Sequence, residues 1–323
     1  MWQFLKRLKI LRKQPPRKLG LALSGGGARG LAHIGVLKVL EEAKIPVHLM
    51  AGTSMGGVIA AIYAAGHPAA EIEQIARSLR LLDIIQRDRT GLGLIGQDKI
   101  VNLLQEIVGD DLSFEQLRLP LALVASDLET GEEVIIREGS VVEAMLATMA
   151  VPILFPPVKR QNRLLVDGGL LNQVPFDVVR QMAGSGTPIR VIAVHTLHGF
   201  SSRPGELTAC ESRRGAESVL RLLIRRSRWA PMFEVAERSY AIISRKQVER
   251  LMLQEPPDLM IEITLDGIGL LDLDQVNVCV KAGEQAARQH LPELLKLRDT
   301  PPPSRLASWW HTITDRFTGT SGK

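Results

Sequence analysis

The chain has 323 residues, enough for one large α/β domain with an appendage, and its hydrophobic fraction of 45% is ordinary for a globular protein. Only two cysteines are present, which argues against a disulfide scaffold and favours a reducing compartment, so we expect a cytoplasmic protein. The net charge of +5 comes largely from residues 1–18, which hold seven Lys or Arg and no acid and leave −2 (5 minus 7) on the rest.

The basic residues of the N-terminus form an amphipathic pattern over residues 1–17. Five apolar residues alternate with the cations: Trp2, Phe4, Leu5, Leu8 and Leu11. This pattern is typical of a helix on an anionic membrane surface, and it predicts that residues 1–18 contact the inner membrane face. A solvated basic tail would show the same pattern, so both interpretations stay open. The segment lacks the uninterrupted apolar run of a secretory signal.

A glycine-rich turn separates the first predicted strand, residues 18–23, from a predicted helix, residues 31–43. Its residues of interest are Gly25, Gly26, Gly27, Arg29 and Gly30. Strand, glycine turn and helix also fit a dinucleotide fingerprint. That fingerprint requires an acidic residue about 20 residues later, and residues 45–51 contain none. No Lys-Ser or Lys-Thr pair closes the glycine run, which excludes a phosphate-binding loop of the P-loop type.

The second motif is Gly52-Thr53-Ser54-Met55-Gly56, between a predicted strand over 49–53 and a helix over 55–65. It places Ser54 on a tight turn at a helix N-terminus, where developing negative charge is favoured. Gly52 and Gly56 suit this turn because a side chain at either position would crowd the backbone. A serine that caps a helix between two packing glycines is the structural alternative.

The third motif, Asp167-Gly168-Gly169, follows a predicted strand over 163–167. Ester hydrolysis through a serine needs a base for the hydroxyl proton and donors for the oxyanion. The three motifs can supply those donors, the nucleophile and the base, in that order along the chain. An aspartate that only begins a turn would look the same in isolation.

Together the motifs resemble those of the patatin-like phospholipases, closest to small bacterial members related to neuropathy target esterase. The resemblance runs from about Lys18 to Val194 and includes further segments: 33–37 (His-Ile-Gly-Val-Leu), 125–131 (Ala-Ser-Asp-Leu-Glu-Thr-Gly), 149–152 (Met-Ala-Val-Pro) and 155–157 (Phe-Pro-Pro). Two positions depart from the family pattern. Family members often have glycine where this chain has Ile153-Leu154, and many have Asn-Asn where it has Asn172-Gln173.

The resemblance implies a Ser–Asp dyad, with Ser54 as nucleophile and Asp167 as general base. It implies an oxyanion hole made by the backbone amides of the Gly25–Gly27 turn. Supporting roles fall to the neighbouring motif residues: Arg29, Gly30, Gly52, Gly56, Gly168 and Gly169. Arg29 either anchors the glycine turn, which we favour, or contacts the lipid phosphate. No metal and no cofactor are expected, since the sequence has neither zinc-ligand spacing nor an Asp-rich calcium loop.

A catalytic histidine is the alternative to an aspartate base. The order Ser, acid, His of an α/β-hydrolase triad would allow His195 or His198. His195 ends an apolar run, so a strand-end role explains it more simply. A carboxylate has an unperturbed pKa near 4, and an aspartate base therefore needs a dry environment that raises its pKa.

Helices alternate with apolar strands along the whole chain, which predicts a three-layer α/β/α fold with a mostly parallel central sheet. Further strands are predicted at 121–127, 133–137, 190–195 and 259–264, and further helices at 69–80, 97–108, 141–149, 175–183, 215–228, 232–252 and 273–297. We divide the chain into a basic tail (1–17), a patatin-like core (18–198), a helical region completing the domain (199–298) and a C-terminal tail (299–323). Residues 91–96 are expected to border the lipid entrance.

The tail that follows three prolines carries Trp309 and Trp310 at helical spacing, which predicts either membrane contact or packing on the domain. No nucleic-acid module accompanies the basic segments. We expect a serine acyl hydrolase that cleaves carboxylic esters of phospholipids or lysophospholipids through an acyl-enzyme. The alternatives are a regulatory or scaffolding relative with little turnover, and a general carboxylesterase or thioesterase.

Overall fold

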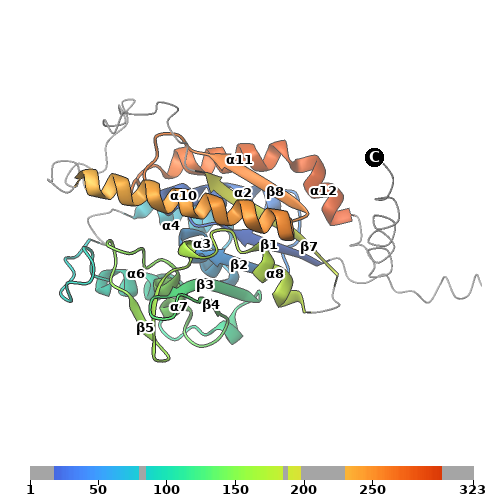
Figure 1. The fold of residues 1–323 in the computed structure, drawn as a ribbon. Helices are drawn as coiled ribbons and strands as arrows, with labels where there is room; N and C mark the ends of the chain where they lie inside the picture. The colour runs from blue at the N-terminus through green and yellow to red at the C-terminus, as the bar shows by residue number, and fades with distance from the viewer. Residues whose placement is uncertain (1–17, 80–84, 185–187, 198–229, 300–323) are drawn as a thin grey trace, which may run out of the picture.

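A computed structural model describes residues 18–79, 85–184, 188–197 and 230–299 (Figure 1). The predicted basic tail, the predicted helix over 215–228 and the segment carrying Trp309 and Trp310 lie outside these residues. Within them, no helix is both long and apolar enough to cross a bilayer.

One sheet organises the described residues. Its strands are β1 (Lys18–Leu23), β2 (Leu49–Thr53), β3 (Leu121–Asp127), β4 (Glu133–Ile136), β5 (Val158–Arg160), β6 (Arg163–Asp167), β7 (Ile189–Leu197) and β8 (Leu259–Thr264). They are ordered β5-β6-β3-β2-β1-β7-β8, with β4 paired to β3. The run from β3 to β8 is parallel, whereas β4 and β6 are antiparallel to β3, and β5 to β6. The predicted mostly parallel sheet is confirmed.

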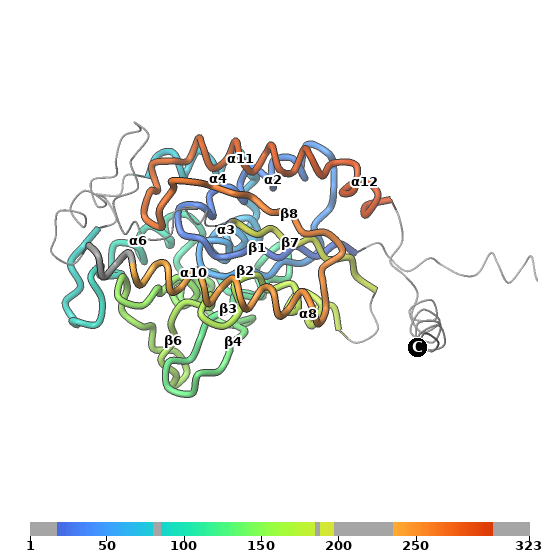
Figure 2. The backbone as a smooth tube through the Cα atoms, turned by 45° about the horizontal axis from the view of Figure 1, so that its top comes forward, coloured from blue at the N-terminus to red at the C-terminus, as the bar shows by residue number. Residues whose placement is uncertain are grey.

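Helices cover both faces of the sheet, as Figure 2 shows. On one face lie α2 (Ala32–Glu42), α3 (Ser54–Ala65), α4 (Ala69–Ser78), α6 (Asp98–Val108), α7 (Val141–Thr148), α11 (Val276–Gln289) and α12 (Leu291–Asp299). On the other lie α8 (Phe176–Ala183) and α10 (Ala230–Gln254). Three short 3-10 helices lie in the connections between these elements: η1 (Gly27–Leu31), η2 (Phe114–Gln116) and η3 (Gly168–Leu170).

The strands separate two hydrophobic layers because successive side chains point to opposite faces. In β1, Leu21 and Leu23 enter the core beneath α2 and α3, while Ala22 faces α8. In β7, Ile192 and Val194 enter the first layer, and Val191 and Ala193 enter the second. Both faces are buried, which explains why these strands read as continuous apolar runs.

The C-terminal part of the chain belongs to the same core. β8 extends the sheet by pairing with β7, and α11 packs along α2. The single helix predicted over 273–297 is wrong: two helices form, and the break falls at His290. Pro292 explains the break, because proline has no N–H to donate and its ring clashes with the preceding helical turn.

Candidate active site

The sheet places the second and third motifs at adjacent register positions on either side of β3. Thr53 at the end of β2 pairs with Val124 of β3, and Asp167 at the end of β6 pairs with the next residue, Ala125. Ser54 and Asp167 therefore flank β3 from its two sides. Neighbouring strands lie about 4.8 Å apart, so the ends of β2 and β6 are two spacings, about 9.6 Å, apart, a gap that two side chains extending toward each other can span.

Ser54 occupies a strained turn between β2 and α3. Its φ is 52°, a left-handed conformation that is uncommon for a residue other than glycine. The Ser54 amide donates to Thr148 Oγ1 at 2.9 Å, and that hydroxyl donates to the Val124 carbonyl. A Cβ on Gly52 would stand 2.6 Å from Gly57 Cα, and one on Gly56 would overlap the Ser24 carbonyl. The turn therefore needs glycine on both sides of Ser54, as the motif predicted.

Asp167 is fully buried, and its carboxylate is held from one side. Oδ1 accepts hydrogen bonds from the Gly169 amide at 2.7 Å and from the Tyr240 hydroxyl at 2.8 Å. Oδ2 accepts none from the residues that the structure describes. Burial raises the pKa of Asp167, and the nearby Ser54 hydroxyl, the Gly169 amide and the Tyr240 hydroxyl oppose that rise. The free acceptor of a buried carboxylate is thus available beside a serine hydroxyl.

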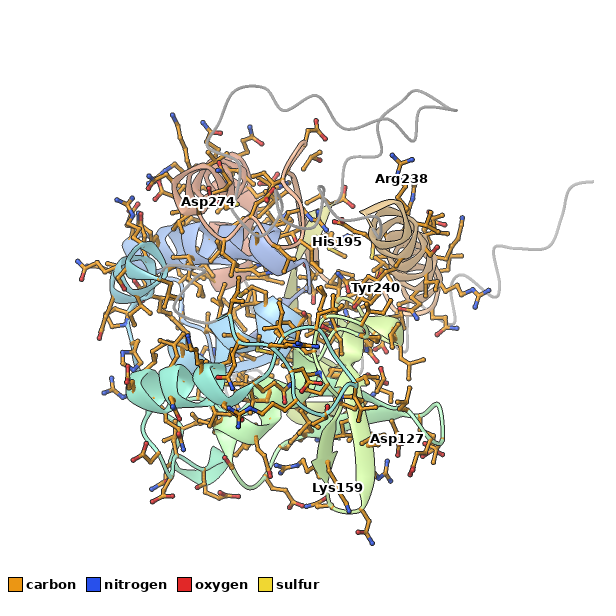
Figure 3. All side chains as sticks on the ribbon, turned by 90° about the vertical axis from the view of Figure 1, so that its left-hand side faces the viewer. Asp127, Lys159, His195, Arg238, Tyr240 and Asp274 are labelled. Carbon is orange, nitrogen blue, oxygen red and sulfur yellow. The ribbon has the colours of Figure 1, made fainter. Side chains whose placement is uncertain are left out.

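Tyr240 is the residue that sequence reasoning missed. It lies on α10, on the inner side of the helix, whereas Arg238 points away from the body (Figure 3). The helix is fixed to the third motif by Ser244 Oγ, which donates to the Gly169 carbonyl at 3.3 Å, and by Gln247, which donates to the Leu170 carbonyl. A Cβ on Gly169 would overlap the Tyr240 hydroxyl, so the second glycine of the motif is the one local signal of this contact.

The glycine turn lies beside Ser54 at the end of β1. A Cβ on Gly25 would stand 3.2 Å from Ser54 Cβ. The Gly25 amide already donates to the Gln173 carbonyl at 3.1 Å, so it is not available to an oxyanion in this conformation. The amides of Gly26 and Gly27 donate to no acceptor among the described residues, and Gly27 adopts a φ of 55°. Of the three amides that the motif suggested as oxyanion donors, those of Gly26 and Gly27 therefore remain candidates.

The Arg29 side chain anchors this glycine turn to residues 237 and 268. Its side chain is buried, and Nη1 donates to the Ile268 carbonyl at 2.8 Å and approaches Glu237 at 3.5 Å. These contacts favour the anchoring role over contact with a lipid phosphate. Gly30 and Gly168 are buried where a Cβ would collide with Met55 and with the Val124 carbonyl, respectively.

The described histidines form no hydrogen bond with Ser54 or Asp167. His33 bonds the Ser24 carbonyl at 2.8 Å through Nε2, and Nδ1 of His195 is buried without a partner in the described structure. Burial lowers the pKa of each to about 4. His198 lies outside the described residues. The geometry thus pairs Ser54 with a carboxylate and with no described imidazole.

An apolar cavity of about 150 Å³ is lined in part by Ser54 and Gly27. Residues of α3, α4 and α6 and of the segments 151–155 and 270–273 form its walls. Apart from Ser54 and Gly27, its lining is entirely aliphatic, methionine or phenylalanine: Leu31, Ile34, Met55, Val58, Ile59, Ile62, Ile72, Ile75, Ala76, Leu79, Ile85, Ile95, Ile100, Leu103, Leu104, Ile107, Met149, Val151, Leu154, Phe155, Leu270, Leu271 and Leu273. No group of three or more His, Cys, Asp or Glu suited to a metal occurs among the described residues.

Fold and site define the class: an α/β protein whose strained, buried serine lies beside a desolvated aspartate and a glycine-rich turn. Residues 21–180 match the family model described as patatin-like phospholipase. The chain belongs to the patatin-like phospholipase family, as its motifs predicted. Tyr240 and its helix lie beyond the matched residues.

Similar proteins agree with this assignment. An uncharacterised NTE family protein of Mycobacterium tuberculosis is 33% identical over 302 residues, which cover 89% of this chain and 49% of that protein. Patatin-like phospholipase domain-containing protein 6 of Mus musculus is 34% identical over 180 residues, or 54% of this chain and 13% of that protein. VipD of Legionella pneumophila is similar in fold, with a TM-score of 0.58 and 15% identity over 87% of this chain and 68% of VipD. The chain spans about half the length of the mycobacterial relative.

Proposed function

We propose that this protein is a serine acyl hydrolase that cleaves carboxylic esters of phospholipids or lysophospholipids. The apolar cavity that ends at Ser54 carries the proposal, because it offers no polar partner except at the reacting end. An acyl chain would fill it and leave its carbonyl carbon beside the Ser54 hydroxyl. Such a site recognises length and apolarity rather than hydrogen-bonding groups.

In the proposed mechanism, Ser54 attacks the ester carbonyl while Asp167 Oδ2 takes the hydroxyl proton. The Gly26 and Gly27 amides stabilise the oxyanion, and the N-terminus of α3 adds a favourable dipole. The alcohol or lysolipid leaves with a proton returned by Asp167. Water, deprotonated by the same carboxylate, then hydrolyses the acyl-enzyme.

The raised pKa of Asp167 supports this role. A carboxylate that is buried without full hydrogen bonding is a stronger base than one in water. The Gly169 and Tyr240 donors lie on Oδ1 and so orient the carboxylate without occupying Oδ2.

A series of nitrophenyl esters of increasing acyl length tests the proposal on the purified full chain. We expect kcat/KM to rise with chain length until the cavity is filled, and Ser54→Ala to abolish turnover and labelling by a fluorophosphonate. Retained labelling in Ser54→Ala would place the nucleophile elsewhere. Absence of turnover and labelling in the folded wild-type protein would favour the regulatory or scaffolding alternative, and preference for short acyl or thioester substrates would favour a general esterase or thioesterase.

A further inference from the structure

Two loops at the outer edge of the cavity carry apolar side chains that face solvent. Leu92 and Leu94 belong to the segment 85–96, which projects beyond α6 at the left-hand edge of Figures 1 and 2. Ile153 belongs to the turn that follows α7. Their exposed fractions are 62%, 49% and 52%, respectively. We call these three residues and their two loops the apolar rim.

The two loops of the apolar rim are joined to each other and to the cavity wall. The Leu94 amide donates to the Ile153 carbonyl at 3.0 Å, and the Ile95 amide to the Leu154 carbonyl at 2.8 Å. Ile95 and Leu154 line the cavity, while the residue before each of them, Leu94 and Ile153, is exposed. One pair of loops therefore forms the cavity wall on its inner side and an apolar surface on its outer side.

Ile153 has a backbone conformation that is unfavourable for isoleucine. Its φ is 75°, in the left-handed region, where a β-branched side chain clashes with the backbone. Glycine would adopt this φ without strain. The turn that imposes it is closed by the Leu154 and Phe155 amides, which both donate to the Val151 carbonyl at 3.1 and 3.0 Å. A strained residue whose side chain gains little from packing points to a role outside the fold.

Hydrogen bonds to the Asp88 side chain order the segment 85–96, the other loop of the apolar rim. The Asp88 carboxylate accepts the Thr90 hydroxyl at 2.6 Å and the amides of Leu92 and Gly93 at 3.1 and 3.2 Å. Asp88 is thereby occupied within its loop. Its neighbours Arg87 and Arg89 are exposed and form no ion pair with the described residues. The loop thus presents leucines beside two cations that have no partner on the described surface.

We propose that the apolar rim docks on a phospholipid surface that contains anionic lipid. Leu92, Leu94 and Ile153 enter the acyl region, and Arg87 and Arg89 lie at the level of the phosphates. Docking in this orientation brings the loops that form one wall of the cavity, through Ile95 and Leu154, against the membrane and shortens the path of a lipid from the bilayer to Ser54. The inference rests on the proposed lipid substrate, and it assigns membrane contact to residues different from the two tails.

Ile153→Gly in the full chain is the decisive variant, because strain and docking predict opposite changes. Its thermal midpoint is expected to equal or exceed that of the wild type, while its binding to vesicles of phosphatidylcholine with phosphatidylglycerol falls at least threefold. Leu92→Ser with Leu94→Ser is expected to lower vesicle binding at least tenfold. Both are expected to hydrolyse a soluble short-chain ester like the wild type. Leu253→Ser is the matched control, since this residue is 87% exposed near the C-terminal end of α10. That end of α10 lies at the right of Figure 1, and the segment 85–96 lies at the left.

Unchanged vesicle binding by the Leu92→Ser, Leu94→Ser protein would overturn the docking surface, even if hydrolysis by Ser54 is established. Equal loss in the Leu253→Ser control would do the same, since it would make the effect a general one of surface apolarity. A lower thermal midpoint for Ile153→Gly would overturn the strain argument. Binding to purely phosphatidylcholine vesicles that matches binding to anionic ones would remove Arg87 and Arg89 from the interface. Failure of wild-type ester hydrolysis alone would contradict the proposed function and leave the vesicle measurements interpretable.

Discussion

Tyr240→Phe removes one hydroxyl and tests whether α10 tunes the proposed base. In the structure that hydroxyl donates to Asp167 Oδ1 at 2.8 Å, in a site where the carboxylate is fully buried. The donor favours the charged form and so lowers the pKa of Asp167 against the rise caused by burial. Its removal therefore raises that pKa further.

The size of the shift follows from the strength of the bond. A hydrogen bond to a charged group contributes about 1.5–3 kcal/mol, and one pKa unit corresponds to about 1.4 kcal/mol. We therefore expect the acidic limb of kcat/KM against pH to move upward by about 1–2 units. Activity is expected to approach that of the wild type at high pH, where Asp167 is ionised in both proteins, and KM is expected to change little.

The assay is turnover of a soluble ester from acid to mildly alkaline pH, with circular dichroism on each protein. Tyr63→Phe is the matched control, because the Tyr63 hydroxyl also lies beside a carboxylate, that of Glu41. Burial raises the pKa of Tyr63 to about 12. This control is expected to keep the wild-type pH profile. If Tyr240→Phe is folded and its acidic limb does not move, the tyrosine does not tune the base.

Three further predictions concern the same site. Asp167→Asn is expected to lower kcat by about 10²–10⁴-fold, as loss of a general base does, while His195→Gln costs less than tenfold; a folded histidine variant as inactive as Asp167→Asn would replace the dyad by a triad. Burial raises the pKa of Asp167, so keeping its carboxylate ionised at neutral pH costs the folded state free energy. Asn carries no charge, and Asp167→Asn is therefore expected to keep or raise the free energy of unfolding, measured with urea. Thr148→Val removes the hydrogen bonds of the Thr148 hydroxyl with the buried Ser54 amide and the Val124 carbonyl. It is expected to lower the free energy of unfolding by about 1–3 kcal/mol and to lower turnover. Wild-type values in both measurements would show that the Thr148 bonds do not support the serine turn.

Much of the fold was readable from the sequence because its signals are local. Short apolar runs buried on both faces, such as β1 and β2, predicted a parallel sheet, and the glycines around Ser54 predicted a crowded turn. The family assignment followed from the same motifs. The break at His290 was also local, since Pro292 marks it, although the prediction passed over it.

The tertiary structure decided what depends on distant residues. Nothing near residue 240 indicates that its hydroxyl reaches a carboxylate 73 positions earlier, and nothing in the glycine motif indicates that Gln173 occupies the Gly25 amide. The same holds for Ile153, whose strain arises from a turn closed against its neighbours and whose exposure depends on the loop packed beside it.

The division has a physical cause. Backbone preferences and apolar periodicity act over a few residues, and they determined the strands, the helices and the turn that exposes the serine. Hydrogen bonds between elements, the burial that raises a pKa and the walls of a cavity exist only after those elements have packed. The sequence by itself therefore indicated Ser54, Asp167 and the glycine turns of the candidate site. The packing of α10 added Tyr240 to that site, and the 85–96 loop and the 151–155 turn decided how its cavity is lined.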